Sequence, residues 1–535
     1  ASVLKSAEQS QIIGYDSDIL VNGVLVGRTT LELDLFSGLV PFNRFVSKFG
    51  HAFQGTDAQV RTVMMRFVEQ AKKKGNLAYT VVREGLDIVS IPHHENATLR
   101  EPFMVWADAR GVIAEPRIIE TGVTLKFQGY PDPRGVFKTD VVAAPRLVDW
   151  TQDKANLGLL EETLTNMMSC QKPEVLGKLI GWYTSCFWKQ AFQKYYMKFP
   201  LLHVNGPAGL GKTEMQIAIS SLFYYQNESR PLSPGSSNFA LGQHLQASSS
   251  IPLILDEYKP HEMVKARHDQ IKALFRDAYN QRDVARGGGN RENDDYRMLQ
   301  FMQLAAPMVF IAEAAEDEAA VMERVVLVTL ARPTQSQGLK NLARFQAFRR
   351  NKNLLGIIGQ YIAAEILAEF SEECFTAEFD EMYNAAQHTY MLNEEDLKGN
   401  LDSAEMQDKQ NAKERPVFNH TVAKFGFRQF RKLLNSLFDN RLDSLMGELE
   451  DGIYSRLSDM HAATTPEYVK VLKEIASMSY HIENDRPDAI RSGQEYAFSV
   501  LGGRDVLELS VHNAYSRYRM YARATNMPAL YPSPE

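Results

Sequence analysis

The stretch Gly206–Thr213 has the residue types and the spacing of a phosphate-binding loop. It reads G-P-A-G-L-G-K-T and fits the pattern G-x-x-x-x-G-K-[S/T]. Glycines let the backbone turn tightly, so that successive N–H groups point at a phosphate. In this pattern Lys212 reaches the β- and γ-phosphates and the hydroxyl of Thr213 holds Mg²⁺. We therefore predict ATP and Mg²⁺ as cofactors. The loop residues assigned to the nucleotide are Gly206, Pro207, Ala208, Gly209, Leu210, Gly211, Lys212 and Thr213.

A pair of acids supports this interpretation. The apolar run Ile251–Leu255 ends in Asp256 and Glu257. In such a pair the first acid holds Mg²⁺, directly or through water, and the second activates the attacking water. Asp256 follows Thr213 by 43 residues, which is enough for a helix, a strand and a helix between two parallel strands. We predict Asp256 as a metal ligand and Glu257 as the catalytic base.

A third apolar run, Pro307–Ala312, ends at Glu313. If its strand lies between the other two, a polar residue at this position would lie beside the γ-phosphate. Glu313 is therefore a candidate catalytic residue.

Arg324 stands directly before a fourth apolar run, Val325–Leu330. Two interpretations are open. Arg324 could be an arginine finger that acts on the ATP of a neighbouring subunit. Alternatively, it is an ordinary surface arginine paired with Glu323 or Asp317.

The segment Ile271–Arg297 is rich in arginine and contains a triple glycine, Gly287–Gly289. An arginine-bearing hairpin would grip the phosphates of single-stranded DNA with little sequence preference. The predicted contacts are Lys272, Arg286 and Arg291. The alternative is a solvated loop with balanced charges, since acids are interleaved at Asp277, Asp283, Glu292, Asp294 and Asp295.

These residues need particular elements to position them. A phosphate loop lies between a buried strand and a helix. Leu201–Val204 is apolar enough for the strand, and Glu214–Leu222 has helical periodicity. With the acids and Glu313 at the ends of further strands, the sequence predicts an α/β core with a phosphate loop over residues 201–335.

Length and composition limit the remaining possibilities. The chain has 535 residues, which suggests two to four domains. The net charge is −7, so contacts with nucleic acid must come from local basic patches. The three cysteines, Cys170, Cys186 and Cys374, form neither a zinc spacing nor a disulfide framework, which favours a reducing compartment. The long apolar run 354–370 is interrupted by Gln360, Glu365 and Glu369 and predicts a core helix. We expect a cytoplasmic protein without a membrane partner.

The predicted domain layout has four regions. Residues 1–150 form an α/β accessory domain and residues 151–200 a helical lead-in. Residues 201–335 form the ATPase domain, and residues 336–535 a mostly helical C-terminal region.

The order of these motifs resembles that of a known family. The succession G-P-A-G-L-G-K-T, P-L-I-L-D-E, A-P-M-V-F-I-A-E and A-V-M-E-R-V-V is similar to the hexameric helicases of the AAA+ class. The similarity is greatest to superfamily 3 and the primase-associated helicases of phages, viruses and plasmids. It covers residues 201–333. The C-terminal run 509–523 also resembles the start of the winged helix of viral primase-helicases.

The resemblance implies a homo-oligomeric ring, expected to be a hexamer, with ATP sites between subunits. It implies a DNA helicase of a phage or mobile-element replication system in a bacterial host cell, with single-stranded DNA and a primase or polymerase as partners. Two residues depart from the family. Its third-strand sensor is usually Asn, where this chain has Glu313. The pore hairpin usually has a Lys or aromatic tip, and here only Arg286 and Arg291 are available. The alternatives are a nucleic-acid loader or packaging motor that does not unwind, and a regulatory scaffolding ATPase.

Overall fold

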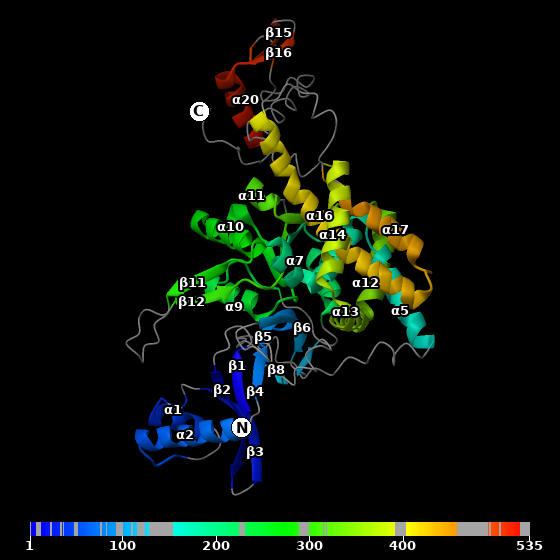
Figure 1. Cartoon of the computed structure of the whole chain (residues 1–535). Coiled ribbons are helices and arrows are strands. Elements are labelled where there is room, and N and C mark those ends of the chain that lie inside the picture. The colour runs from blue at the N-terminus through cyan, green and yellow to red at the C-terminus, as the bar shows by residue number, and fades with distance from the viewer. Residues whose placement is uncertain are drawn as a thin grey trace. The chain divides into compact units, whose positions relative to one another are not determined.

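The computed structural model divides the chain into two compact units, residues 1–457 and 458–535 (Figure 1). The structure describes residues 2–6, 12–21, 24–32, 35, 37–47, 52–74, 77–81, 83–92, 100–108, 111–114, 124–127, 154–223, 231–287, 299–313, 316, 318–390, 403–455, 457, 491, 494–501 and 504–524.

A four-stranded parallel sheet forms the centre of the first unit. Its strands are β9 (Leu201–Asn205), β10 (Leu253–Tyr258), β13 (Met308–Ala312) and β14 (Val325–Thr329). The order across the sheet is β10-β13-β9-β14, and every pairing is parallel. The strand that precedes Glu313 therefore lies between the phosphate-loop strand and the strand of the acid pair. This order meets the condition that the sequence analysis set for Glu313, whose catalytic role stays a prediction.

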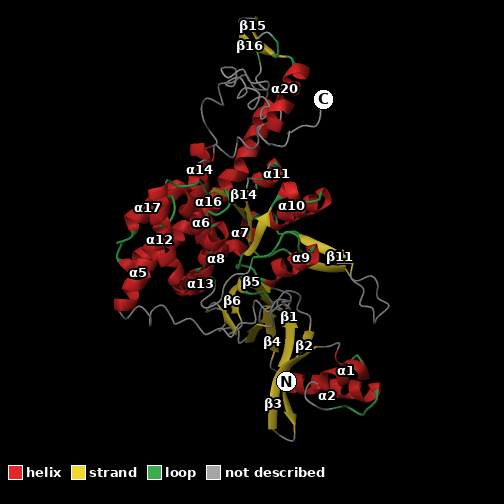
Figure 2. Ribbon diagram, turned by 180° about the vertical axis from the view of Figure 1, so that it is seen from behind, coloured by secondary structure: helices red, strands yellow, loops and turns green. Residues whose placement is uncertain are grey.

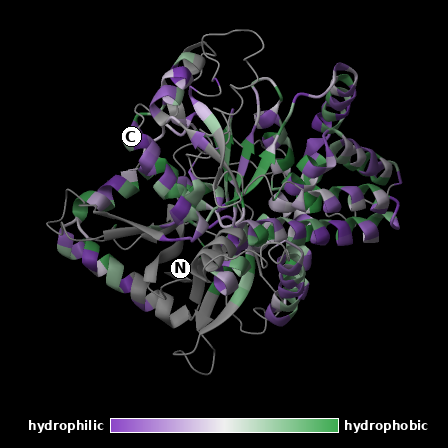
Figure 3. Cartoon of the chain, turned by 90° about the horizontal axis from the view of Figure 1, so that it is seen from above, coloured by the Kyte–Doolittle hydropathy of each residue, from purple (hydrophilic) through white to green (hydrophobic). Residues whose placement is uncertain are grey.

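Helices cover both faces of this sheet, as Figure 2 shows. On one face, His203 and Phe310 stack with ring centroids 4.3 Å apart. Phe275 of α10 (Lys265–Tyr279) stacks on Phe310 at the same distance. Side chains pointing to the other face, such as Leu202 and Val309, join a large apolar core with helices that precede and follow the sheet in the sequence. Figure 3 shows the apolar character of the central strands. This layered arrangement confirms the predicted α/β class of the core.

The large core contains helices from before and after the sheet. The helices before the phosphate loop are α5 (Lys154–Ser169), α6 (Pro173–Ser185) and α7 (Lys189–Tyr196). Those after the sheet are α12 (Gln335–Arg350), α13 (Leu355–Glu369), α14 (Glu372–Tyr390), α16 (Ser403–Phe438) and α17 (Asp443–Asp451). The aromatic side chains of the lead-in, including Trp182, Phe187 and Phe192, are buried in this core. These rings pack against other core side chains, so they have no exposed face on which a nucleic-acid base could stack.

Helices α6 and α16 cross at very close range. A Cβ atom added at Gly181 would lie 2.2 Å from the carbonyl oxygen of Ala423. One added at Gly426 would lie 2.2 Å from the carbonyl oxygen of Gly181. The two glycines therefore let the backbones touch, and they fix α16 against the helix that supports the sheet.

The N-terminal part contains two further sheets. The first, in the order β3-β2-β1-β4-β8, consists of β1 (Ser2–Ser6), β2 (Ile12–Val21), β3 (Val24–Glu32), β4 (Leu77–Val81) and β8 (Thr124–Phe127). Its helices are α1 (Leu39–Val46) and α2 (Asp57–Lys74). The second consists of β5 (Gly85–Pro92), β6 (Arg100–Asp108) and β7 (Gly111–Ala114).

The β5–β6–β7 sheet is hydrogen-bonded to residues 248–250, which lead into the central sheet. The N–H of Leu86 donates to Ser250 Oγ at 2.9 Å, and Ser248 Oγ donates to the carbonyl oxygen of Glu84 at 2.9 Å. These serines lie just before β10. The boundaries of the four predicted regions stay a prediction.

The second unit contains a hairpin and a helix. Strands β15 (Tyr496–Leu501) and β16 (Arg504–Leu509) pair antiparallel, and α20 (Val511–Ala524) follows them. The hairpin lies in the region that the sequence predicted to be mostly helical, and its two strands are only six residues long and lack strict polar–apolar alternation.

Among the described helices, no single one is long and apolar enough to cross a membrane. Residues 352–369 and 372–390 pass such a test only when they are taken together across a bend of 115°.

Candidate nucleotide-binding site

The phosphate loop follows β9 and leads into α8 (Lys212–Ile219). Gly206, Gly209 and Gly211 have φ angles of 141°, 79° and 72°, which a residue with a Cβ atom rarely adopts. At Gly206 a Cβ atom would also lie 2.3 Å from the carbonyl oxygen of Leu330. Gly211 is the N-cap residue of α8, so the loop ends at free backbone N–H groups and the positive end of a helix dipole. This is the geometry of an anion site.

Lys212 is folded back over this loop. Its Nζ donates to the carbonyl oxygens of Gly206 at 2.6 Å and Pro207 at 3.0 Å. Burial lowers the pKa of Lys212, while the charges of Glu313 and Asp256 act in the opposite direction. The lysine therefore lies in the field of both predicted acids, and the three side chains gather at one edge of the sheet.

Thr213 and Asp256 are in direct contact. Thr213 Oγ1 lies 3.0 Å from each carboxylate oxygen of Asp256. A hydroxyl and a carboxylate side by side fit Mg²⁺, which prefers oxygen ligands and takes one or two carboxylates together with substrate phosphates. In the described part of the chain, no group of three or more His, Cys, Asp and Glu side chains could hold a metal ion. A site completed by ATP does not need such a group.

Glu257 lies on a β-bulge that the sequence did not reveal. Leu255 pairs with Phe310 and Tyr258 pairs with Ala312, so two residues of β10 face a single residue of β13. Glu257 is exposed and has a left-handed φ of 59°, and its N–H donates to Asp256 Oδ1 at 2.9 Å. The bulge takes Glu257 out of the alternation of the strand and points it to solvent beside Asp256.

A buried polar cluster holds the residue that follows Glu257. The hydroxyl of Tyr258 contacts the carboxylate of Glu316. His268 Nε2 lies 3.1 Å from the same hydroxyl. The N–H of Glu316 donates to Nε2 of His203 in β9 at 3.2 Å. Burial lowers the pKa of His203 to about 4, which keeps the ring neutral and able to accept this bond. Sequence reasoning missed this cluster, since its members lie on four separate segments.

Glu313 is exposed directly after β13, and its charge acts on Lys212. The sheet order thus places its carboxylate between the phosphate loop and the acid pair.

Arg324 lies at the opposite edge of the sheet. Its carbonyl oxygen accepts from the N–H of Leu201, the first residue of β9, so the whole length of that strand separates it from Gly206. Its guanidinium lies over the ring of Tyr279, 5.7 Å from the centroid, and Nη1 donates to the carbonyl oxygen of Ala320. Arg324 is half-buried, and this burial lowers its pKa.

The alternative interpretation of Arg324 paired it with Glu323 or Asp317. Glu323 instead pairs with Arg415, at 2.7 Å. Asp317 lies outside the described residues.

The predicted hairpin between α10 and β13 is present. Strands β11 (Asp283–Gly287) and β12 (Leu299–Gln303) pair antiparallel, with Arg286 opposite Gln300. Arg291 lies outside the described residues. Lys272 lies on α10, not on the hairpin, and its ammonium is 2.8 Å from the carboxylate of Glu318. A contact between Lys272 and DNA would have to compete with this ion pair, and the three DNA contacts stay predictions.

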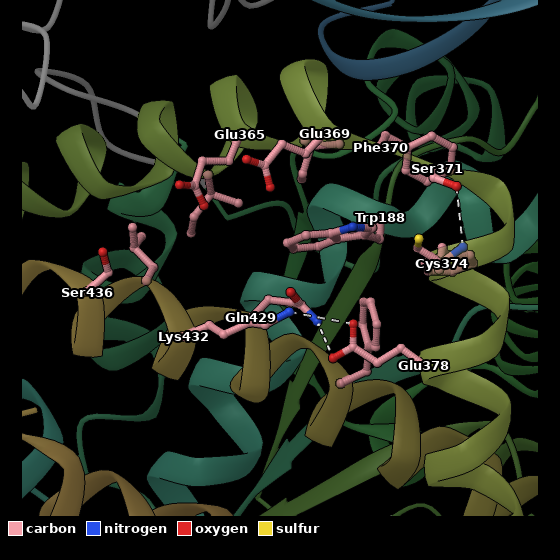
Figure 4. Close-up of a pocket in the computed structure, with 15 residues that line it drawn as sticks. Trp188, Glu365, Glu369, Phe370, Ser371, Cys374, Glu378, Gln429, Lys432 and Ser436 are labelled. Atoms are coloured by element: carbon pink, nitrogen blue, oxygen red, sulfur yellow. Dashed lines mark hydrogen bonds and ion pairs between the residues drawn. The ribbon is translucent and has the colours of Figure 1, made fainter.

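A cavity of about 400 Å³ lies between α13, α14 and α16 (Figure 4). Its lining includes the rings of Trp188 and Phe425 and the carboxylates of Glu365, Glu369 and Glu378. None of the predicted nucleotide residues lines it. Its three carboxylates outnumber its one lysine, Lys432, so its charge does not favour a triphosphate.

Comparison with known proteins shows the fold. No protein-family model matches the sequence, and no curated protein matches it. Among solved structures, the chain is similar to SCCmec type IV Cch, described as an active helicase. The TM-score is 0.56 at 10% sequence identity, over 97% of this chain and 86% of that one. A Cytophaga hutchinsonii protein, provisionally described as an ATPase, aligns with a TM-score of 0.29 at 12% identity, over 56% of this chain and 85% of that one. The chain therefore shares its fold with a helicase.

Proposed function

We propose that the chain is an ATP hydrolase that works as a ring and moves single-stranded DNA, as a DNA helicase or translocase. The observation that carries the proposal is the gathering of Lys212, Thr213, Asp256 and Glu313 at the carboxyl edge of one parallel sheet. The shared fold with the helicase Cch supports it.

At this edge each side chain has a role that its position allows. The loop N–H groups and Lys212 would bind the β- and γ-phosphates, and Lys212 would exchange its bonds to loop carbonyls for bonds to phosphate. Thr213 and Asp256 would hold Mg²⁺, which neutralises phosphate charge when bound. Glu257, exposed beside Asp256, would take the proton of the attacking water. Glu313 would orient that water from the neighbouring strand.

Arg324 requires a second copy of the chain. It is at the wrong edge of the sheet for its own nucleotide, and its guanidinium is fixed in place. In a head-to-tail ring, one edge of a subunit faces the opposite edge of the next. Arg324 would then reach the γ-phosphate held by the neighbour and stabilise the charge that develops during transfer.

Arg286 of β11, together with the predicted contacts Arg291 and Lys272, would bind the DNA backbone. The finer assignments are proposed on the resemblance of the motifs: a hexamer of the superfamily 3 type, encoded by a phage or mobile element, in the cytoplasm of a bacterial host, with a primase or polymerase as partner.

The deciding experiment measures ATP hydrolysis with and without single-stranded DNA, together with the native mass by light scattering. Hydrolysis stimulated by DNA in a species near six subunits is the expected result. A strand-displacement assay then separates a helicase from a loader or packaging motor. A monomer whose hydrolysis ignores DNA would overturn the proposal and favour a regulatory ATPase.

A further inference from the structure

Arg324 is held from outside the ATPase core by a buried asparagine. Asn419, on α16, has no exposed surface. Its Nδ2 lies 2.9 Å from the carbonyl oxygen of Glu323 and 3.4 Å from that of Val325, the two residues flanking Arg324. A single side-chain amide thus fixes the main chain on both sides of the arginine.

The same asparagine also holds the surface on which the guanidinium rests. Asn419 Oδ1 accepts from the hydroxyl of Tyr279 at 3.2 Å. Burial raises the pKa of this hydroxyl, which therefore stays protonated and donates. The ring of Tyr279 lies under the Arg324 guanidinium, a cation–π arrangement that restricts the plane of the arginine. The carbonyl oxygen of Tyr279 accepts from the N–H of Phe199, which ties the ring to the lead-in of β9.

The guanidinium itself is incompletely bonded. In the described part of the structure, Arg324 Nε is buried and has no hydrogen-bond partner. Most buried polar groups have a hydrogen-bond partner, so a buried donor without one needs an explanation. Arg324 is fixed at its main chain and at its ring contact, and Nη1 donates to the carbonyl oxygen of Ala320 while Nε has no partner among the described residues. Because a guanidinium carries five N–H donors, it keeps donor capacity for an acceptor from outside the subunit.

We propose that Tyr279 and Asn419 are positioning residues that aim Arg324 at the nucleotide of the neighbouring subunit. The inference rests on the proposed function and extends it. It makes α16 part of the machinery that acts between subunits. Arg415, on the same helix, strengthens this connection through its ion pair with Glu323.

The test uses the full chain with variants that remove one contact each. Tyr279→Phe keeps the ring and removes the bond to Asn419, and Asn419→Leu removes all three bonds. Since a small misplacement of a catalytic group costs up to about 100-fold, we expect kcat to fall by about 10- to 100-fold with KM nearly unchanged. Tyr454→Phe is the matched control. It removes a buried hydrogen bond to Thr421, 2.9 Å long and on the same helix, without touching Arg324. It should retain the wild-type kcat.

Subunit mixing separates positioning from misfolding. Each variant is mixed with Lys212→Ala subunits, which cannot use ATP but carry an intact Arg324. The variant subunit supplies an intact ATP site, and the Lys212→Ala subunit supplies an intact Arg324. When the two are mixed 1:1 in random head-to-tail rings, about a quarter of the interfaces combine these two intact parts, so activity should reappear. Arg324→Ala is mixed in the same way as the reference.

Loss of kcat in the Tyr279→Phe and Asn419→Leu variants, with recovery of ATP hydrolysis on mixing, supports the inference. A wild-type kcat in Asn419→Leu would overturn the inference. So would a loss of kcat that mixing does not restore, if mixing does restore the activity of Arg324→Ala. Both outcomes would leave the proposed function standing. Full activity in Arg324→Ala would instead overturn the arginine finger itself.

Discussion

The two edges of the central sheet are built in opposite ways. The carboxyl edge carries exposed acids, a left-handed Glu257 and glycines with positive φ. The amino edge carries a half-buried arginine fixed by side chains from two helices, with Asn419 fully buried beneath it. The carboxyl edge leaves room for a ligand, whereas the amino edge presents one side chain, Arg324, in a fixed orientation.

This difference indicates what each edge must do. A site that binds and releases a nucleotide needs exposed donors and ligands that can exchange their partners. A side chain that acts on a nucleotide held by another subunit needs a fixed orientation, because it does not have to change partners when the nucleotide binds and leaves. Variants at the two edges should therefore fail in different ways: those at the carboxyl edge can lose binding, and those at the amino edge should lose only turnover.

Lys212→Ala should have the largest effect. In the proposed site, it removes the cation that would bind the triphosphate in both the ground state and the transition state. Loss of transition-state stabilisation alone is worth about 10³-fold, and loss of ground-state binding adds to it, so we expect kcat/KM for ATP to fall by more than about 10³-fold. Nucleotide affinity should be lost in a fluorescent-ATP titration. The control is Lys272→Ala, a lysine on α10 that pairs with Glu318. Nucleotide affinity equal to the wild type in Lys212→Ala would contradict the loop assignment.

Arg324→Ala should come next and separates the two edges most clearly. An arginine finger contributes about 10³-fold or more to turnover, so kcat should fall by about 10³-fold while the nucleotide Kd stays unchanged. Light scattering should show that assembly persists. A higher nucleotide Kd in this variant would mean that the amino edge also takes part in ground-state binding.

Glu257→Gln keeps the shape of the side chain and removes its basicity. General-base catalysis contributes about 100-fold or more, so turnover should drop by that amount with ATP still bound. Single-turnover measurements should show bound, unhydrolysed ATP. Normal turnover in Glu257→Gln would transfer the role of the base to another residue, with Glu313 as the first candidate.

Glu313→Asn should have the smallest effect at the carboxyl edge. An amide can still form a hydrogen bond with the attacking water, so we expect a change in kcat of less than about 10-fold. Glu313→Ala removes that ability and should lower kcat by more than Glu313→Asn does. Equal rates in the two variants would show that Glu313 does not contact the water.

The strands of the carboxyl edge could be predicted from the sequence because its residues occur in short, contiguous motifs. The strand before the loop and the strands that end at the acid pair and at Glu313 are apolar runs followed by polar residues. The sequence did not show the order of these strands and set the central position of the Glu313 strand only as a condition. The bulge at Glu257 could not be predicted either, because it depends on which residue of β13 faces which residue of β10.

Apart from Arg324 itself, the residues of the amino edge could not be predicted from the sequence. Asn419 bonds to a carbonyl oxygen 96 residues earlier in the chain and to a tyrosine 140 residues earlier. No periodicity or motif links these positions. The polar side chain of Asn419 has no distinguishing neighbours within its own helix. The packing of α16 in the helical region, including its close crossing with α6, brings Asn419 to Arg324.

The left-handed Glu257 has a consequence for how this chain would respond to selection. A residue with a Cβ atom in that conformation costs roughly 1–2 kcal/mol, which glycine would not incur. Glu257→Gly should therefore unfold at a higher denaturant concentration than the wild type while failing to hydrolyse ATP. A screen for thermal tolerance alone would enrich inactive proteins at this position. The wild-type glutamate persists only where activity is selected together with stability.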